Sequence, residues 1–413
     1  MLAAARAGKL AAMEPADPVC TQPAAAPVAA AGFTEPPAFT AEAHGNRLTF
    51  LARGAERLAA LLDLIAGARA SLHLCFYIYA RDEAGAQVRD ALVTAARRGV
   101  EVRVLVDGFG ADAREAFFAD LLQAGGAFAV FSDRWSRRYL VRNHQKMVIA
   151  DGARAMIGGF NVEESYFADR PNEGWTDLGI VIEGPVAAAI DRWFDQLKTW
   201  SAAEHQRWRL IRRMLRDWDP GDGPVQVLLG GPRRLRRGWA RTVSRDMIRA
   251  RRLDLMMAYF TPPPRLLHRI AAVEKRGKAR LVLAGKSDNG ATIGASRSLY
   301  SYLLKRGVAI WEFGACKLHT KLIVIDDVCY FGSANFDMRS LLINLELMVR
   351  IEDAALAAQL RGFIDGHLAG AEEITPALHR QRATWFNRLR WAASWALVGV
   401  VDYTVTRRLN LGQ

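Results

Sequence analysis

The sequence has few cysteines and no long apolar run, and both features limit what the protein can be. Only four of its 413 residues are cysteine, they form no CxxC pair, and Cys75 and Cys329 lie inside apolar segments. Buried free thiols in a reducing compartment fit this pattern better than a disulfide framework. No segment reaches the ~20 apolar residues of a membrane-spanning helix, and Lys9 and Glu14 interrupt the alanine-rich start where a signal peptide would be apolar. We therefore expect a cytoplasmic protein without a spanning helix.

Acidic residues are also in the minority. There are 43 Asp and Glu against 56 Lys and Arg, which leaves a net charge of +13. This excess favours a polyanionic partner such as nucleic acid, an anionic lipid surface or a phosphate-bearing substrate, without choosing among them. Because 51% of the residues are hydrophobic, the chain can bury a large core, and its length allows two or three domains.

The order of apolar segments shows an internal duplication. The series SLHLCFYIY, GAQVRDALVTAARRG, EVRVLVDGFG and KMVIADGARAMIGG returns as RRLDLMMAYF, PRLLHRIAAVEKRG, ARLVLAG and KLIVIDDVCYFGS. Strands alternating with helices predict an α/β fold of two homologous lobes, each a mixed β-sheet flanked by helices. We expect the lobes over 46–220 and 221–370. Residues 1–45, rich in Ala and Pro, are expected to be disordered, and 371–413 to form a C-terminal amphipathic segment.

Each half carries one copy of a polar motif. The copies are HQKMVIADGARAMIGGFN, with His144, Lys146, Asp151, Gly159 and Asn161, and HTKLIVIDDVCYFGSAN, with His319, Lys321, Asp326, Ser333 and Asn335. Alternate residues of a strand share a face, so the histidine and the lysine of each copy point together into one pocket. A single His-x-Lys is more often a solvated strand edge, but two copies with matching offsets indicate catalysis. We predict one active site shared by the two halves.

The paired motifs resemble the HxKxxxxD…GG/GSxN signature of the phospholipase D superfamily. The flanking segments GNRLTFLARG, IGGFNVEESY and GSANFDMRSLLINLE, with the WTD and EGP pair, are similar to those of bacterial cardiolipin synthases of the non-spanning kind. The resemblance covers roughly residues 46–350. It implies two phospholipase D-like lobes with the active site at their interface, and a phosphatidyl transfer in which phosphatidylglycerol is donor and acceptor. It also implies that His144 is the nucleophile and His319 the acid and base.

The residue types of the motifs fit this chemistry. One imidazole can attack phosphorus and form a phosphohistidine, while a second protonates the departing alkoxide and later deprotonates the incoming alcohol. The lysines and asparagines of both motifs can donate hydrogen bonds to the phosphate oxygens, and Gly159 and Ser333 can let the backbone approach them. These donors replace the positive field of magnesium, and no carboxylates cluster at ligand spacing, so we expect no metal and no other cofactor.

Carboxylates have two predicted roles. Asp177 in GWTDLGI and Glu346 in NLELMV follow the asparagine of their own copies, and they are candidates for orienting the histidines, with an ordinary strand-edge carboxylate as the alternative. Asp151 and Asp326 complete the catalytic motifs, but each lies seven residues after its histidine, at an Asp-Gly or Asp-Asp turn. Their position suggests that they brace a turn. The second hairpin is one residue shorter, which leaves the placement of Ser333 open.

The substrate class depends on other segments, because the superfamily includes lipid transferases, phospholipases and nucleases. The stretch 193–218 mixes tryptophan and arginine, and TWFNRLRWAASWALVGVVDYTVTRRL near the end sets Trp385, Trp391 and Trp395 beside apolar residues with arginines at both ends. This composition is typical of an interfacial helix, although 193–218 could equally be a core helix.

We therefore expect anionic phospholipid substrates, a peripheral position on the inner cell membrane and no nucleic acid partner. Stacking aromatic residues with arginines also bind single strands, so a phospholipase D or a metal-independent phosphodiesterase or nuclease stays the alternative function. The sequence leaves the oligomeric state open.

Overall fold

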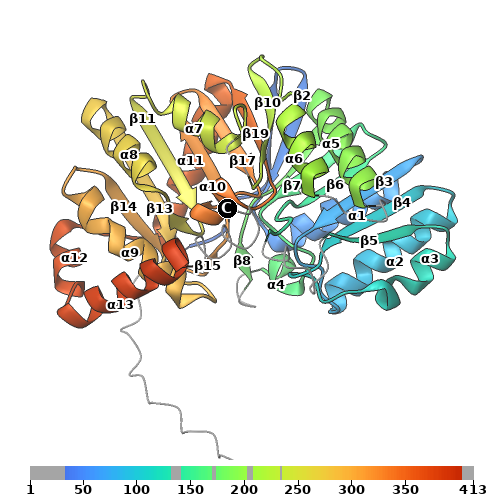
Figure 1. Ribbon diagram of the computed structural model, residues 1–413, viewed down its shortest axis with the longest axis horizontal. Coiled ribbons are helices and arrows are strands. Elements are labelled where there is room, and N and C mark those ends of the chain that lie inside the picture. Colours follow the sequence, from blue (N-terminus) through green and yellow to red (C-terminus); the bar gives the residue numbers. More distant parts are fainter. Residues whose placement is uncertain (1–32, 132–140, 170–173, 202–207, 233–234, 402–413) are drawn as a thin grey trace, which may run out of the picture.

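Each half of the chain forms one lobe built on an eight-stranded mixed sheet (Figure 1). The computed structural model describes residues 33–131, 141–169, 174–201, 208–232 and 235–401. In spatial order, the sheet of the first lobe consists of β1 (Phe39–Ala43), β2 (Asn46–Leu51), β9 (Gly179–Glu183), β7 (Arg154–Gly158), β6 (Met147–Ala150), β3 (Ser71–Phe76), β4 (Glu101–Asp107) and β5 (Ala127–Phe131).

The second sheet repeats this arrangement. In spatial order it consists of β10 (Val225–Gly230), β19 (Glu346–Glu352), β17 (Val328–Gly332), β16 (Lys321–Ile325), β11 (Arg252–Met257), β13 (Lys278–Ala284), β14 (Ala309–Phe313) and β20 (Ala371–Glu373). The run from β2 to β5 and the run from β10 to β14 match in order and in strand direction, with parallel pairing only at β3-β4-β5 and β11-β13-β14. The predicted duplication and α/β fold are confirmed.

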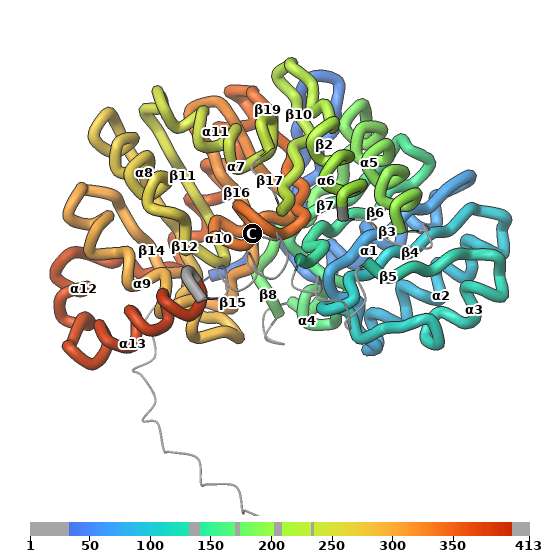
Figure 2. The backbone as a smooth tube through the Cα atoms, viewed as in Figure 1, coloured from blue at the N-terminus to red at the C-terminus, as the bar shows by residue number. Residues whose placement is uncertain are grey.

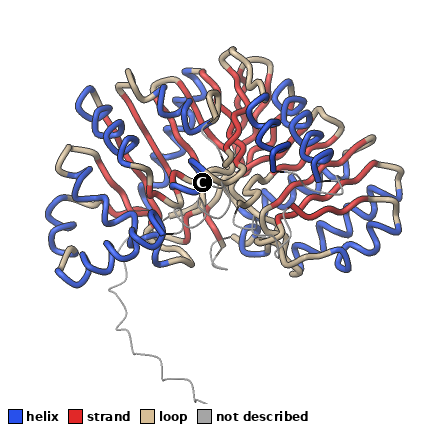
Figure 3. Tube along the Cα trace, in the orientation of Figure 1, coloured by secondary structure: helices blue, strands red, loops and turns tan. Residues whose placement is uncertain are grey.

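Helices connect and cover the two sheets, which converge on the middle of the molecule (Figure 3). The first lobe contains α1 (Gly54–Gly67), α2 (Glu83–Arg97), α3 (Ala119–Gln123), α4 (Glu164–Phe167) and α5 (Pro185–Ser201), and α6 (Trp208–Asp217) leads to the second lobe. The second contains α7 (Trp239–Asp246), α8 (Pro264–Arg276), α9 (Gly290–Leu304), α10 (Met338–Leu342), α11 (Ala354–His367), α12 (Pro376–Arg382) and α13 (Trp385–Trp395). Separate apolar cores lie between each sheet and its outer helices.

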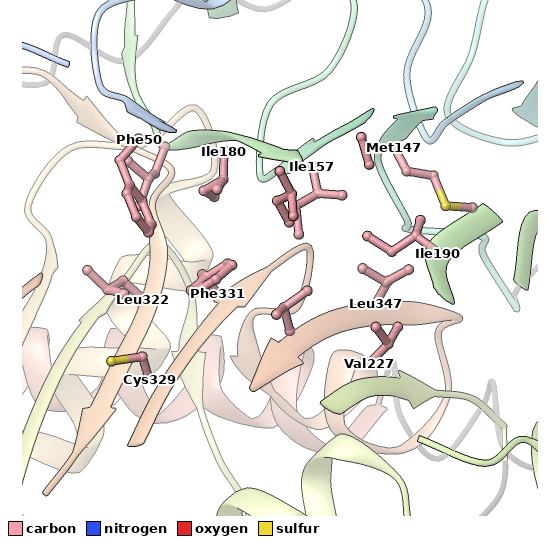
Figure 4. Close-up of a cluster of buried hydrophobic side chains, with 14 of the residues drawn as sticks. Phe50, Met147, Ile157, Ile180, Ile190, Val227, Leu322, Cys329, Phe331 and Leu347 are labelled. Carbon is pink, nitrogen blue, oxygen red and sulfur yellow. The ribbon is translucent and has the colours of Figure 1, made fainter. Parts of the chain in front are cut away.

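A third apolar core joins the lobes. Figure 4 shows side chains of the first sheet, among them Phe50 and Ile157, pointing toward Leu322, Phe331 and Leu347 of the second. The rings of Phe50 and Phe331 meet edge to face with 5.6 Å between centroids. These strands read as continuous apolar runs because they are buried on both faces. The two active-site motifs are therefore held against each other by a core that both lobes supply.

Two expectations about the ends of the lobes need correction. Residues 39–43 are not disordered, because they form β1, which pairs with β2, and Figure 2 shows this hairpin beside β10 and β19 of the second lobe. There the His44 ring nitrogen lies 2.8 Å from the carbonyl of Glu352. Residues 1–32 lie outside the described residues. The C-terminal segment is not separate from 371 on, because β20 extends the second sheet. The expected boundary at residue 220 falls in the connection between α6 and β10.

For the tryptophan-rich stretch 193–218, the structure selects the core helix over the interfacial helix. Its described residues belong mainly to α5 and α6. Residues 202–207 and the side chain of Trp208 lie outside the described part. Trp193 and Trp200 are completely buried in the inter-lobe core, and the Trp193 indole donates to the side chain of Gln145 at 3.0 Å. These tryptophans serve packing, so they give no support to a lipid surface.

Candidate active site

A short parallel ladder joins the lobes and ends at predicted site residues. β15 (Lys317–Leu318) of the second lobe pairs with β8 (Trp175–Thr176) of the first, with Leu318 opposite Thr176. The residues that follow are His319 and Asp177. The backbone N–H of His319 donates to the Thr176 carbonyl at 2.7 Å, which continues the ladder by one step. Backbone pairing thus brings a histidine of one lobe to a carboxylate of the other.

A second contact of the same kind lies on the opposite side of the site. Asn143 and Leu345 form an isolated parallel bridge, and the next residues are His144 and Glu346. The His144 N–H donates to the Leu345 carbonyl at 2.9 Å. The two halves of the site are therefore built alike. In each, the residue before a motif histidine pairs with the residue before the acid.

The histidines exchange carboxylates between the lobes. His319 Nδ1 lies 2.7 Å from Asp177 Oδ2, and His144 Nδ1 lies 3.0 Å from a carboxylate oxygen of Glu346. Both acids are the residues expected to orient the histidines, and each lies beside the histidine of the opposite copy rather than its own. Because the carboxylates hold Nδ1, the Nε2 atom of each ring is the nitrogen left for chemistry.

Burial sets the charge of the four groups. Burial, followed by the nearby lysines, lowers the pKa of His144 well below its usual value and that of His319 to about 3, so both are neutral in the empty site at neutral pH. Burial raises the pKa of Glu346 to about 7 despite Lys146. For Asp177 burial acts in the same direction, but the hydrogen bond from His319 and the charge of Lys321 outweigh it and lower the pKa. At neutral pH Asp177 is therefore fully ionised, whereas Glu346 is about half protonated.

The motif lysines lie beside the histidines. Lys146 and Lys321 are buried, and each Nζ donates to the carbonyl of the histidine two residues before it. Burial lowers the pKa of Lys146 to about 7 and that of Lys321 to about 8. Each ammonium has three donors, so donors remain for an anion in the site.

The asparagines are buried next to the same strands. Asn161 accepts the Ile78 N–H through Oδ1 at 3.1 Å, which fixes the orientation of its amide. The Oδ1 atom of Asn335 is buried and has no hydrogen-bond partner among the described residues. An unsatisfied buried amide is costly unless a ligand completes its hydrogen bonds.

Gly159 and Ser333 support the acids rather than a phosphate. A Cβ atom on Gly159 would lie 2.6 Å from Asp177 Oδ1 and 2.9 Å from the His319 carbonyl oxygen, so glycine makes room for Asp177 of its own lobe and His319 of the other. The Ser333 hydroxyl donates to Glu346 at 2.5 Å and accepts the Leu347 N–H at 3.0 Å. These contacts differ from the predicted approach of backbone to phosphate. The shorter second hairpin does not displace Ser333, because its turn has two residues where the first has three.

The motif aspartates are not part of the site, which corrects their place among the catalytic residues. Asp151 and Asp326 lie at the far ends of β6 and β16, exposed and in the left-handed region, with φ of 55° and 47°. Their carboxylates accept backbone N–H groups that precede β3 and β11 or begin them, namely those of Arg69, Ala70 and Ser71 and of Arg251 and Arg252. Each therefore braces a turn against the neighbouring strand.

Three aromatic rings that line the site were not among the predicted residues. The Tyr77 ring lies 4.9 Å from that of His144, and the rings of Tyr166 and Trp175 lie 5.0 and 5.3 Å from that of His319. Tyr77 stands directly after β3, the strand at the start of the duplicated series, and this position is the signal that could have found it. The other two come from the segment that ends in WTD.

A buried arginine holds that segment. Arg57 of α1 is completely buried, and its guanidinium donates to the carbonyls of Ala52, Tyr166, Trp175 and Asp177. Three of these four carbonyls belong to residues that surround His319 of the other lobe. In the sequence Arg57 is an ordinary helix residue, so no signal marked it.

Two features are absent from the described residues. No group of three or more His, Cys, Asp or Glu side chains there is placed to hold a metal ion. Among the same residues no helix combines the length and the apolar character that crossing a membrane requires.

The chain is similar to known cardiolipin synthases along most of its length. Residues 61–198 and 245–367 match the family described as cardiolipin synthase, PLD-like domain. The major cardiolipin synthase ClsA of Bacillus subtilis (strain 168) is 31% identical over 354 residues, which cover 82% of this chain and 72% of that protein. Cardiolipin synthase B of Escherichia coli (strain K12) is 30% identical over 352 residues, which cover 83% and 85%.

Solved structures share the two-lobed arrangement. The crystal structure of phosphatidylserine synthase from Haemophilus influenzae Rd KW20 matches with a TM-score of 0.68 and 15% identity, over 88% of this chain and 97% of that one. Polyphosphate kinase from Porphyromonas gingivalis matches with a TM-score of 0.56 and 14% identity, over 81% and 49%. At such identities the likeness establishes the fold alone.

Proposed function

The chain belongs to the cardiolipin synthase family with phospholipase D-like domains and is a phosphatidyltransferase of that superfamily; from this premise we propose that phosphatidylglycerol is both its donor and its acceptor. The product is then cardiolipin, and glycerol is released. The observation that carries the proposal is the pair of motif histidines, His319 buried and the His144 side chain 12% exposed, each oriented by a carboxylate of the opposite lobe.

In the first step His144 Nε2 attacks the phosphorus of the donor. The P–N bond forms as the P–O bond to glycerol breaks, and His319 gives its Nε2 proton to the departing oxygen. In the second step His319 removes a proton from the hydroxyl of a second phosphatidylglycerol. That oxygen attacks phosphorus, the P–N bond breaks, and both imidazoles return to their starting state.

The difference between the two acids supports this assignment of roles. Asp177, whose pKa is lowered, is an anion that stabilises the imidazolium form of His319, which the acid needs. Glu346, whose pKa is raised to about 7, supplies less negative charge, so His144 stays neutral and nucleophilic. A bound phosphodiester adds negative charge and raises the pKa of His319 toward the range in which it can carry a proton.

The remaining motif residues fit transition-state stabilisation. The Nζ atoms of Lys146 and Lys321 and the amides of Asn161 and Asn335 are the proposed donors to the non-bridging oxygens. The small exposed fraction of the His144 side chain, 12%, favours a lipid hydroxyl over water as the acceptor, because it limits the access of water to the phosphohistidine.

We also propose that the protein acts peripherally on the inner face of the cell membrane, with anionic phospholipids as its partners and without nucleic acid. The net charge of +13 supports this position. So do the lipid products named for its relatives.

Incubation of the purified protein with phosphatidylglycerol tests the proposal. Cardiolipin and glycerol should appear in equal amounts, and His144→Ala and His319→Ala should abolish both, whereas His268→Ala, on α8 away from the site, should not. Acid quenching should trap a phosphorylated peptide that contains His144. Phosphatidic acid without cardiolipin would refute the synthase and assign a hydrolase, and DNA cleavage that depends on His144 would assign a nuclease.

A further inference from the structure

Exposed apolar side chains gather on the last described helix. Among the described residues seven large apolar side chains are exposed, and four of them belong to α13 and the π-helical turn Ala396–Val401 that follows it. These four are Trp385 (78% exposed), Phe386 (60%), Leu389 (62%) and Leu397 (57%). The other three, Phe109, Leu210 and Ile248, are scattered over the molecule, as single exposed apolar residues usually are.

Packing against the second lobe turns these side chains outward. Trp391, on the opposite side of the helix from Leu389, is buried and stacks on His379 with 5.6 Å between ring centroids. A Cβ on Gly294 of α9 would lie 2.7 Å from Ser394 Oγ, so glycine lets α13 lie close against α9. Trp385, Leu389 and Ala393 recur at intervals of four and therefore line one exposed face, which Phe386 borders. We call Trp385, Phe386, Leu389 and Leu397 the apolar stripe.

Positive charge flanks the apolar stripe on both sides. Arg388 and Arg390 are exposed and stand one residue before and one after Leu389, which places them ~100° to either side of it. The helix contains no acidic residue. An apolar face bordered by arginines is the pattern of a helix that lies in the surface of an anionic bilayer, with its apolar side chains among the acyl chains and the arginines at the phosphates.

Two contacts link the active site to the start of α9, the helix against which α13 packs. The Tyr259 ring is 6.3 Å from that of His319, and the Tyr259 hydroxyl donates to Asp288 at 3.3 Å. Asp288 stands two residues before α9, along which α13 packs. Figure 1 shows α13 at the lower edge of the second lobe, on the same side of the molecule as β8 and β15.

We propose that the apolar stripe of α13 inserts into the surface of an anionic phospholipid bilayer and holds the active site at its lipid substrates. This inference rests on the proposed function, since a lipid substrate is the reason to bind a bilayer. It assigns membrane attachment to one face of one helix rather than to the whole of 371–413 or to the Trp-rich stretch between the lobes.

Co-sedimentation of the full chain with vesicles tests the assignment. Wild type should bind vesicles of phosphatidylglycerol and phosphatidylcholine and bind pure phosphatidylcholine vesicles less. Leu389→Glu and Trp385→Ser should weaken binding to the mixed vesicles by at least ~10-fold, because burial of one large apolar side chain accounts for that factor or more. The matched control is Ile248→Glu, which changes an exposed apolar residue outside the stripe and should bind as wild type does.

A second measurement separates this proposal from the enzymatic one. The ratio of cardiolipin formation on vesicles to that in detergent micelles should fall about 10-fold in Leu389→Glu and stay constant in Ile248→Glu. Equal binding by wild type and both stripe variants, or an equal loss in the control, would overturn the proposal that the apolar stripe binds the bilayer. So would a stripe substitution that dissociates an oligomer and leaves vesicle binding intact, because a second copy would then occupy the stripe. Wild type that binds vesicles through the stripe but forms no cardiolipin would overturn the proposed function alone.

Discussion

The exchange of carboxylates between the lobes makes Asp177 the most informative position to change. Asp177→Asn keeps the size of the side chain and removes its charge. Because the Leu178 N–H donates to Oδ1 at 2.7 Å, the amide oxygen of Asn would keep that place and the NH₂ group would face His319. Nδ1 of His319 would then have to accept a hydrogen bond, so its proton would move to Nε2. His319 in that tautomer cannot take the proton of the incoming alcohol.

The lost charge sets the size of the effect. Two unit charges ~4 Å apart interact by about 4 kcal/mol at an effective dielectric constant of ~20. At 1.36 kcal/mol per factor of ten this corresponds to about a 10³-fold loss of kcat. Glu346→Gln should cost less, about 10- to 100-fold, because burial raises the pKa of Glu346 to about 7 and leaves it less charge to lose.

The assay is steady-state cardiolipin formation at pH 7, with the thermal midpoint measured for each variant. The control is Asp191→Asn, which breaks a His–Asp pair of the same 2.7 Å length, with His73, outside the site. Its kcat should stay within about two-fold of wild type. A loss below 10-fold in Asp177→Asn, or equal losses in Asp177→Asn and Glu346→Gln, would refute the argument that the two acids differ in charge.

Four further predictions follow from other contacts. Gly159→Ala should lower kcat by at least ~10-fold as measured by cardiolipin formation, because the new methyl group displaces Asp177; unchanged kcat would contradict the steric argument. Asp151→Asn should leave kcat unchanged. Although partial burial raises the pKa of Asp151, backbone N–H donors lower it below its usual value, so its stabilisation is present above pH ~4 and lost as pH falls further, and the variant should flatten the acid limb of thermal midpoint against pH. Since Lys146 has a pKa of about 7, kcat/KM should fall as pH rises from 7 to 8, while kcat, which reports the phosphate-bound enzyme, should fall only at higher pH. Arg57→Met should destabilise the fold by at least about 3 kcal/mol in denaturant unfolding, because buried carbonyls lose their donor, and Arg57→Lys should recover part of the loss.

The sequence predicted the duplication and the shared site because both depend on local pattern. A buried strand followed by a polar motif can be read from consecutive residues, and its repetition with matching offsets identifies the two lobes. Asp177 and Glu346 could be selected in the same way, from their position after the asparagines. Their exchange could not, because it depends on pairing between Thr176 and Leu318, which lie in different lobes.

Composition was a weaker guide than pattern. Tryptophan mixed with arginine describes both the buried α5 and the exposed α13, and only packing separates Trp193, which is fully buried, from Trp385, which is 78% exposed. The motif aspartates show the same limit in another form. A residue can belong to a characteristic motif and still stand at the far end of a strand, where Asp151 accepts backbone N–H groups instead of serving the site.

The exchange also explains why the lobes share so large an apolar core. Neither motif histidine has its carboxylate in its own lobe, so His144 and His319 are oriented only while the sheets stay packed together. The backbone ladders that deliver the pairs are short, at most two residues of each strand, and could not hold the lobes alone. The core around Phe50 and Phe331 provides the association that the ladders lack. Catalysis therefore depends on inter-lobe packing. Substitutions at the inter-lobe core should reduce activity before they unfold either lobe.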